Sequence, residues 1–179
     1  MIKVRRIGVF LFVLALMNVA GSHANPGQRQ KLAWLSPEEM SAKYALSRRP
    51  IIVDVYTSWC YYCKVMDNST WQNDSVINYL SDRFYTVKLD AECKDSFLLM
   101  GEKFEYIPKY KLNNLAIKLL QGNMVYPSTV IIPENGDPEI LKGAFTAAEM
   151  EMVFKYYGDK QNETSTPEAF QKKFRGNWK

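Results

Sequence analysis

The stretch that decides the fold runs from residue 51 to residue 64 and reads IIVDVYTSWCYYCK. Residues 51–56 are apolar and β-branched apart from one acid, Asp54, a pattern typical of a short central strand covered on both faces. Cys60 and Cys63 follow, with two residues between them, where we expect the chain to leave the strand and begin a helix. A Cys-x-x-Cys pair between a buried strand and a helix predicts thiol–disulfide chemistry.

The predicted helix start gives the two cysteines different roles. Cys60 would occupy the helix N-terminus, where unpaired N–H groups and the helix dipole favour a thiolate, so we expect Cys60 to be the nucleophile. Cys63 lies about one turn further on, close enough to attack a mixed disulfide on Cys60 and release the product. A purely structural disulfide here would close a tiny loop and stabilise little. Half of a zinc site would need two more ligands, and only Cys93 and carboxylates remain.

The flanking sequence predicts short strands separated by helices. Capping boxes at Ser36 and Thr146 mark two helix starts, and Gly122 marks a helix end. Helices are expected over 37–47, 60–68, 73–83, 96–104, 113–121, 146–157 and 167–174, and strands over 51–56, 84–90, 128–132 and 139–142. A strand–helix–strand unit followed by a β-hairpin and a closing helix predicts an α/β fold with a central mixed sheet flanked by helices.

Residues 51–64 resemble the active-site segment of thioredoxins, and residues 126–130, YPSTV, resemble the cis-proline segment of that family. The resemblance covers about residues 32–157 and is greatest to exported thioredoxin-like proteins akin to the C-terminal domain of the disulfide-reductant transporter DsbD. It implies a thioredoxin fold and thiol–disulfide exchange. The sequence departs from the family pattern in two places. Tyr61-Tyr62 replaces the family's Gly-Pro pair, which affects the expected reduction potential. Residues 109–122 lengthen the stretch before Pro127, which affects the expected substrate surface.

The resemblance also implies roles for two further residues, because their positions match functional positions of the family. Asp54 lies six positions before Cys60, as the family's buried acid does, and would accept and return the Cys63 proton with its own pKa raised by burial. The alternative is a strand acid paired with Lys88 on the neighbouring strand. Pro127, if cis, would hold an extended edge that pairs with a substrate peptide; the alternative is an ordinary trans turn proline.

Aromatic residues around the cysteines are the candidate client contacts. Trp59, Tyr61, Tyr62 and Tyr126 would form an apolar docking surface, although Trp59 would also suit plain core packing. Lys64 would bias the local field or simply be a solvated lysine. A third cysteine, Cys93, is expected to be a small buried apolar residue, with a regulatory mixed disulfide as the alternative.

The N-terminus predicts export. Lys3, Arg5 and Arg6 precede an apolar run over 7–21 that ends in Ser22-His23-Ala24, which is the pattern of a signal peptide over residues 1–24. An uncleaved anchor is the alternative. Loss of this segment takes three basic residues and lowers the net charge from +4 to +1, so nucleic acid is not an expected partner. It also takes the only histidine, which excludes Cys-His and Ser-His catalysis and His-rich metal sites in the mature chain.

The mature chain is then divided into a flexible leader over 25–31, a thioredoxin-like domain over 32–157, and a polar linker with a short helix over 158–179. We expect a monomeric periplasmic oxidoreductase that reduces protein disulfides through the Cys60–Cys63 pair, with no metal and no organic cofactor. Its partners would be disulfide-containing client proteins and a membrane thiol-reductant donor of the DsbD type. Alternatives are a dedicated reductant for cytochrome maturation, a disulfide oxidase or isomerase, and a non-catalytic binding module on the same fold.

Overall fold

The computed structural model describes residues 30–99 and 101–179. The predicted signal peptide and the predicted leader up to residue 29 lie outside the described residues. Within the two described ranges, no helix is both long enough and apolar enough to cross a membrane.

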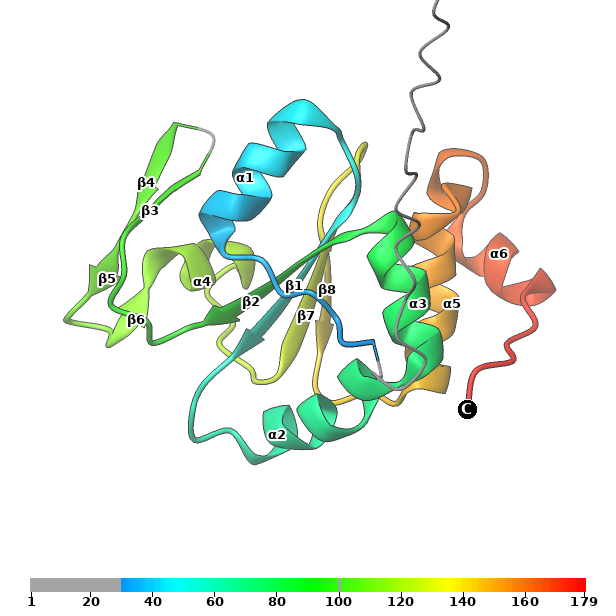
Figure 1. Cartoon of the computed structure of the whole chain (residues 1–179), viewed down its shortest axis with the longest axis horizontal. Helices are drawn as coiled ribbons and strands as arrows, with labels where there is room; N and C mark the ends of the chain where they lie inside the picture. The colour runs from blue at the N-terminus through cyan, green and yellow to red at the C-terminus, as the bar shows by residue number, and fades with distance from the viewer. Residues whose placement is uncertain (1–29, 100) are drawn as a thin grey trace, which may run out of the picture.

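A four-stranded mixed sheet forms the centre of the molecule (Figure 1). It consists of β1 (Ile51–Tyr56), β2 (Tyr85–Asp90), β7 (Ser128–Ile132) and β8 (Glu139–Lys142), in the order β2-β1-β7-β8. β1 runs parallel to β2 and antiparallel to β7, and β8 is antiparallel to β7. The predicted central mixed sheet flanked by helices is therefore confirmed.

Alternation along β1 divides the core into two layers, because successive side chains of a strand point to opposite faces. Val53 and Val55 face a layer that contains Met40 of α1 (Pro37–Leu46) and Leu115 of α4 (Asn114–Leu119). Ile52 faces the other layer, which is built from α2 (Tyr61–Asn68), the 3₁₀ turn η1 (Thr70–Gln72), α3 (Asp74–Arg83) and α5 (Ala147–Gly158). Two residues on from Ile52, Asp54 is placed on this second face, beneath α2.

Helix starts follow the predicted capping signals. Ser36 and Glu39 form a reciprocal capping box at α1, and Thr146 and Glu149 form another at α5. Asn73 begins α3 by accepting hydrogen bonds from two backbone N–H groups. These local bonds satisfy donors that the first turn of a helix leaves free.

The helix predicted over 96–104 is wrong, because this segment is a hairpin of β3 (Phe97–Leu99) and β4 (Glu102–Phe104). Phe97 pairs with Phe104 and both are buried, whereas Leu98 pairs with Lys103 and both are exposed. This alternation has a period of two, as a half-buried strand requires. Gly101 lies in the turn with φ at +83°, a conformation that glycine adopts without a steric penalty.

A second hairpin follows, formed by β5 (Tyr106–Ile107) and β6 (Leu112–Asn113), and the sequence pattern did not predict it. The next helix, α4, is shorter than the predicted 113–121. It ends at Leu119, and both Gln121 and Gly122 have positive φ, which stops the helix as predicted for Gly122. The two hairpins and α4 lie together at one end of the molecule (Figure 1).

The C-terminal segment packs on the outside of α5 (Figure 1). It contains a 3₁₀ turn, η2 (Gln161–Glu163), and α6 (Pro167–Lys173), where a short helix is predicted. Trp178 contacts Tyr79 of α3 and Phe154 of α5 with ring centroids 5.5 and 6.3 Å apart. The buried Glu151 carboxylate accepts hydrogen bonds from the backbone N–H groups of Asn177 and Trp178.

Candidate active site

Cys60 and Cys63 form a disulfide at the start of α2, with their Cα atoms 5.3 Å apart. Cys60 is the N-cap residue, and its Sγ accepts a hydrogen bond from the Cys63 backbone N–H over 3.1 Å. In the reduced protein this N–H and the positive end of the helix would stabilise a thiolate on Cys60 more than on Cys63. The predicted placement of the pair is confirmed, and it favours Cys60 as the attacking sulfur.

Three aromatic side chains surround the pair and are open to solvent. Trp59, Tyr61 and Tyr62 are 64%, 70% and 61% exposed, which excludes core packing as the reason for Trp59. The rings of Tyr61 and Tyr62 contact each other edge to face. We call these three residues the aromatic surface; so large an exposed apolar area beside a reactive group is typical of a binding surface.

Trp59 is held from two sides. Its indole Nε1 donates a hydrogen bond to Glu92 Oε1 over 3.0 Å, and its ring meets the Tyr126 ring edge to face at 5.9 Å. Glu92 belongs to the turn after β2, and nothing in the local sequence pattern singles it out. The contact with Tyr126 brings the cis-proline segment beside the residue that precedes Cys60.

The Tyr126–Pro127 peptide bond is cis, as the resemblance implies. Pro127 leads directly into β7, and its carbonyl accepts a hydrogen bond from the Gly143 N–H over 2.8 Å. The segment is thus attached to the sheet on the β8 side and to Trp59 on the cysteine side.

Asp54 is buried, with a side chain only 2% exposed. One oxygen, Oδ2, lies 3.6 Å from Lys88 Nζ, and Lys88 is its register partner on β2. The other, Oδ1, is buried without a hydrogen-bond partner among the described residues. Burial raises the pKa of Asp54 to about 7, because the opposing pull of Lys88 is only partial and the nearby Asp67 carboxylate adds to the rise. The pairing with Lys88 and a pKa suited to proton transfer therefore coexist.

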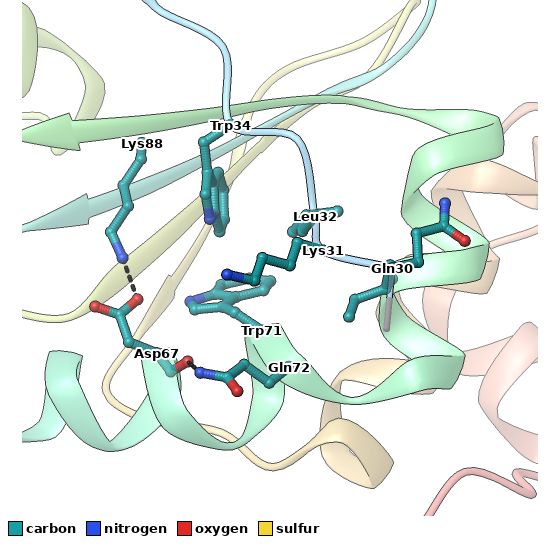
Figure 2. A pocket seen from close by; sticks show the side chains of 9 residues that line it. Gln30, Lys31, Leu32, Trp34, Asp67, Trp71, Gln72 and Lys88 are labelled. Atoms are coloured by element: carbon teal, nitrogen blue, oxygen red, sulfur yellow. Dashed lines mark hydrogen bonds and ion pairs between the residues drawn. The ribbon is translucent and has the colours of Figure 1, made fainter. Parts of the chain in front are cut away.

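Lys88 also makes a direct ion pair with Asp67 of α2, a residue that the sequence pattern did not identify. Its Nζ lies 5.0 Å from the ring centroid of Tyr56 and 5.5 Å from that of Trp34. The pair lines a pocket of about 350 Å³. Figure 2 shows the two side chains there, with the indole rings of Trp34 and Trp71 beside them.

Two other candidate residues lie outside this arrangement of groups. Lys64 is exposed on α2. Cys93 is half-buried against the core layer beneath α1 and α4, and burial, helped by Asp90 and Asp95, raises the pKa of its thiol to about 11. In the described ranges 30–99 and 101–179, no cluster of three or more histidine, cysteine, aspartate or glutamate side chains is placed to hold a metal ion.

Comparison with known proteins agrees with this geometry. Residues 33–113 match the family model described as Thioredoxin-like. Among solved structures, a DsbH oxidoreductase is 19% identical, with a TM-score of 0.51, over 76% of this chain and 90% of that chain. A thioredoxin-fold protein from Helicobacter pylori is 15% identical, with a TM-score of 0.50, over 70% of this chain and 79% of that chain. The oxidised C-terminal domain of Neisseria meningitidis DsbD is 19% identical, with a TM-score of 0.44, over 73% of this chain and 99% of that domain.

The chain therefore contains a thioredoxin-like domain, matched over residues 33–113, and has a mixed α/β thioredoxin fold. Because that fold carries a Cys-x-x-Cys pair at disulfide distance, at a helix N-terminus, the protein is a thiol–disulfide oxidoreductase.

Proposed function

We propose that the protein is exported to the cell envelope and there reduces disulfides in other proteins. The observation that carries this proposal is the position of Cys60, whose Sγ caps α2 and accepts the Cys63 N–H. A sulfur in that position is a good thiolate, and a thiolate is what attacks a disulfide.

The reaction begins with the reduced pair. The Cys60 thiolate attacks one sulfur of the client disulfide, which forms a Cys60–client disulfide and releases the other client sulfur as a thiolate. Cys63 then loses its proton and attacks Cys60 Sγ, which closes the Cys60–Cys63 disulfide and releases the second client thiolate. One client thiolate takes up the proton that Cys63 lost and the other takes up a proton from water, so two electrons and two protons pass to the client.

Asp54 is the proposed acceptor of the Cys63 proton. Its unpartnered Oδ1 and its pKa of about 7 support this role, because a base poised near neutral pH both takes a proton and gives it back. The returned proton goes to the departing client thiolate through water. In the pairing with Lys88, the ammonium stabilises the ionised carboxylate only partially, so the proton remains exchangeable.

The aromatic surface, Tyr126 and Pro127 are the proposed docking site for the client. The exposed rings of Tyr61 and Tyr62 offer apolar contact on one side of Cys60, and the segment at Pro127 offers backbone groups on the other. A client segment that lies extended across Cys60 suits this arrangement. We therefore expect disulfides in flexible or unfolded segments to react faster than those inside folded domains.

Residues 1–24 support export. Each turnover leaves Cys60–Cys63 as a disulfide, and an oxidising compartment will not reduce that disulfide again. We therefore propose that a membrane thiol-reductant donor of the DsbD type recharges Cys60–Cys63 in the periplasm. The protein would act as a monomer, with the cysteine pair as its only redox group and with no metal or organic cofactor.

A covalent trap tests the proposal. In a Cys93→Ala background, Cys63→Ser leaves the nucleophile but removes the resolving sulfur. This variant should therefore accumulate mixed disulfides with clients that contain a disulfide, and none with clients that have been reduced and alkylated. Cys60→Ser in the same background is the matched control and should trap nothing. Equal trapping by both variants, or trapping by Cys60→Ser alone, would contradict the role assignment.

A further inference from the structure

Lys88 is shared unequally between two carboxylates. Its ammonium contacts Asp67 Oδ1 directly, whereas the nearest oxygen of Asp54 lies 3.6 Å away. The two acids come from different elements, Asp54 from β1 and Asp67 from α2, the helix that Cys60 begins. The lysine therefore links the cysteine helix to the buried acid, and it lies closer to the helix.

We infer that Asp67 is a positioning residue that holds Lys88 away from Asp54 and so leaves the Asp54 carboxyl free to keep and exchange a proton. This inference rests on the proton role proposed above for Asp54. Asp67 touches neither the cysteines nor a client in this account; it acts through Lys88.

The surroundings of Asp54 leave few groups able to take over this control. From β2 comes Lys88, and from α2 comes Asp67. The indole N–H of Trp71 in η1 lies near enough to favour the ionised carboxylate slightly, but it makes no hydrogen bond to Asp54 Oδ1. α3 and α5 contribute apolar side chains to this layer, among them Ile77 and Phe154.

The two acids differ in how far they are exposed to solvent. The Asp54 side chain is 2% exposed, whereas those of Lys88 and Asp67 are 21% and 35% exposed. Both members of the outer pair line the pocket of Figure 2, together with Lys31 and the two indoles. The Lys88–Asp67 pair thus faces solvent while the Asp54 carboxyl remains dry, so the contact between Lys88 and Asp54 is screened less than the contact between Lys88 and Asp67.

Removal of the Asp67 charge should lower the pKa of Asp54 for two reasons. Without its partner, the Lys88 ammonium can turn fully to Asp54, and the repulsion between the two carboxylates also disappears. Both changes favour ionised Asp54 and therefore lower its pKa. Removal of Lys88 has the opposite effect, because it deletes the only cation that favours the ionised carboxylate in this set.

Carbon-13 NMR titration of the aspartate carboxyls in the oxidised full-length chain tests this directly. Asp67→Asn should lower the titration midpoint of Asp54 by about one pH unit, and Lys88→Met should raise it. Asp82→Asn is the matched control, since Asp82 is exposed and pairs with Arg83 on α3 rather than with Lys88. An unchanged or raised midpoint in Asp67→Asn, or an equal fall in Asp82→Asn, would overturn the inference.

A second measurement separates this inference from the proposed function. The rate at which Cys63 resolves a preformed Cys60 mixed disulfide should show its pH dependence displaced to lower pH in Asp67→Asn, and Asp54→Asn should slow resolution throughout. If the Asp54 midpoint falls in Asp67→Asn but Asp54→Asn resolves normally, the proton role is wrong and the control by Asp67 stands. If Asp54→Asn is slow and the midpoint in Asp67→Asn does not move, the proton role stands and the control by Asp67 is wrong.

Discussion

Trp59 Nε1 donates a hydrogen bond to Glu92 Oε1 over 3.0 Å, which ties the residue before the reactive cysteine to the turn after β2. An indole that is 64% exposed would otherwise sample several rotamers. The bond to Glu92 and the edge-to-face contact with Tyr126 hold the ring beside the disulfide, in a position where it can contact a client.

Truncation of this ring should impair reaction with proteins more than reaction with small disulfides. We expect Trp59→Ala to reduce kcat/KM for a protein disulfide by about tenfold, as loss of an aromatic anchor does at other interfaces. Reaction with a small aromatic disulfide, which needs no docking surface, should change little. Glu92→Gln, which keeps the acceptor oxygen, should behave close to wild type. An equal loss on both substrates would mean that Trp59 acts on the thiolate rather than on docking.

Replacement of the buried acid should stabilise the fold at high pH. The pKa of Asp54 is raised to about 7 in the folded state, so folded protein binds more protons than unfolded protein between about pH 4 and 7. Stability contributed by the neutral acid is full below about pH 4 and is lost as the pH rises through 7. Urea unfolding of the oxidised protein should therefore show Asp54→Asn gaining on the order of 3 kcal/mol over wild type at pH 8 and much less at pH 4. A wild type more stable than Asp54→Asn at pH 8 would contradict this.

Cys93 should be inert beside Cys60. With its pKa raised to about 11, about one thiol in a thousand is ionised at pH 8. After reduction, iodoacetamide should label Cys60 long before Cys93, as mass spectrometry of digests would show. Cys93→Ala should leave the rate of disulfide reduction unchanged. Loss of activity in that variant would instead support a regulatory mixed disulfide.

The contacts of Glu151 with the C-terminal segment should stabilise the folded protein to an extent that depends on pH. Burial acts to raise its pKa, but hydrogen bonds from Lys155 and from the N–H groups of Trp178 and Asn177 outweigh it and hold the pKa below the usual range. A lowered acid pKa gives stability that is present at neutral pH and lost as the pH falls through it. Glu151→Gln should cost about 2 kcal/mol at pH 7 in urea unfolding, and the difference should shrink below pH 4.

The exposed Glu38 supplies the matched control for that experiment. Glu38→Gln changes an acid of the first turn of α1 to the same amide and should cost only a few tenths of a kcal/mol. A loss in Glu38→Gln as large as that in Glu151→Gln would show that the effect reflects net charge rather than the docked segment.

Local signals account for what the sequence predicted well. The strand over 51–56, the helix start at Cys60 and the capping boxes each depend on residues that are near one another in the sequence, and each is present in the structure. The cis bond before Pro127 could be predicted from the family resemblance but not from residue propensity, since most X-Pro bonds are trans.

The features that were predicted wrongly or not predicted from the sequence depend on tertiary contacts. Residues 96–104 contain enough helix formers to resemble a short helix, but burial of Phe97 and Phe104 on one side selects a hairpin. The ion pair of Asp67 with Lys88 joins residues 21 positions apart on α2 and β2. Its partners become neighbours only when the helix packs on the sheet, so no local pattern identifies Asp67.

The reduction potential of the Cys60–Cys63 pair decides whether the protein exchanges disulfides as a reductant. The chain lacking residues 1–24 would be equilibrated in glutathione and dithiothreitol buffers, and the dithiol fraction read by alkylation. We expect a reversible two-electron couple near −270 mV, the value typical of thioredoxin. A value near −120 mV, typical of DsbA, would make the protein an oxidant, and the absence of any reversible couple would contradict thiol–disulfide exchange itself.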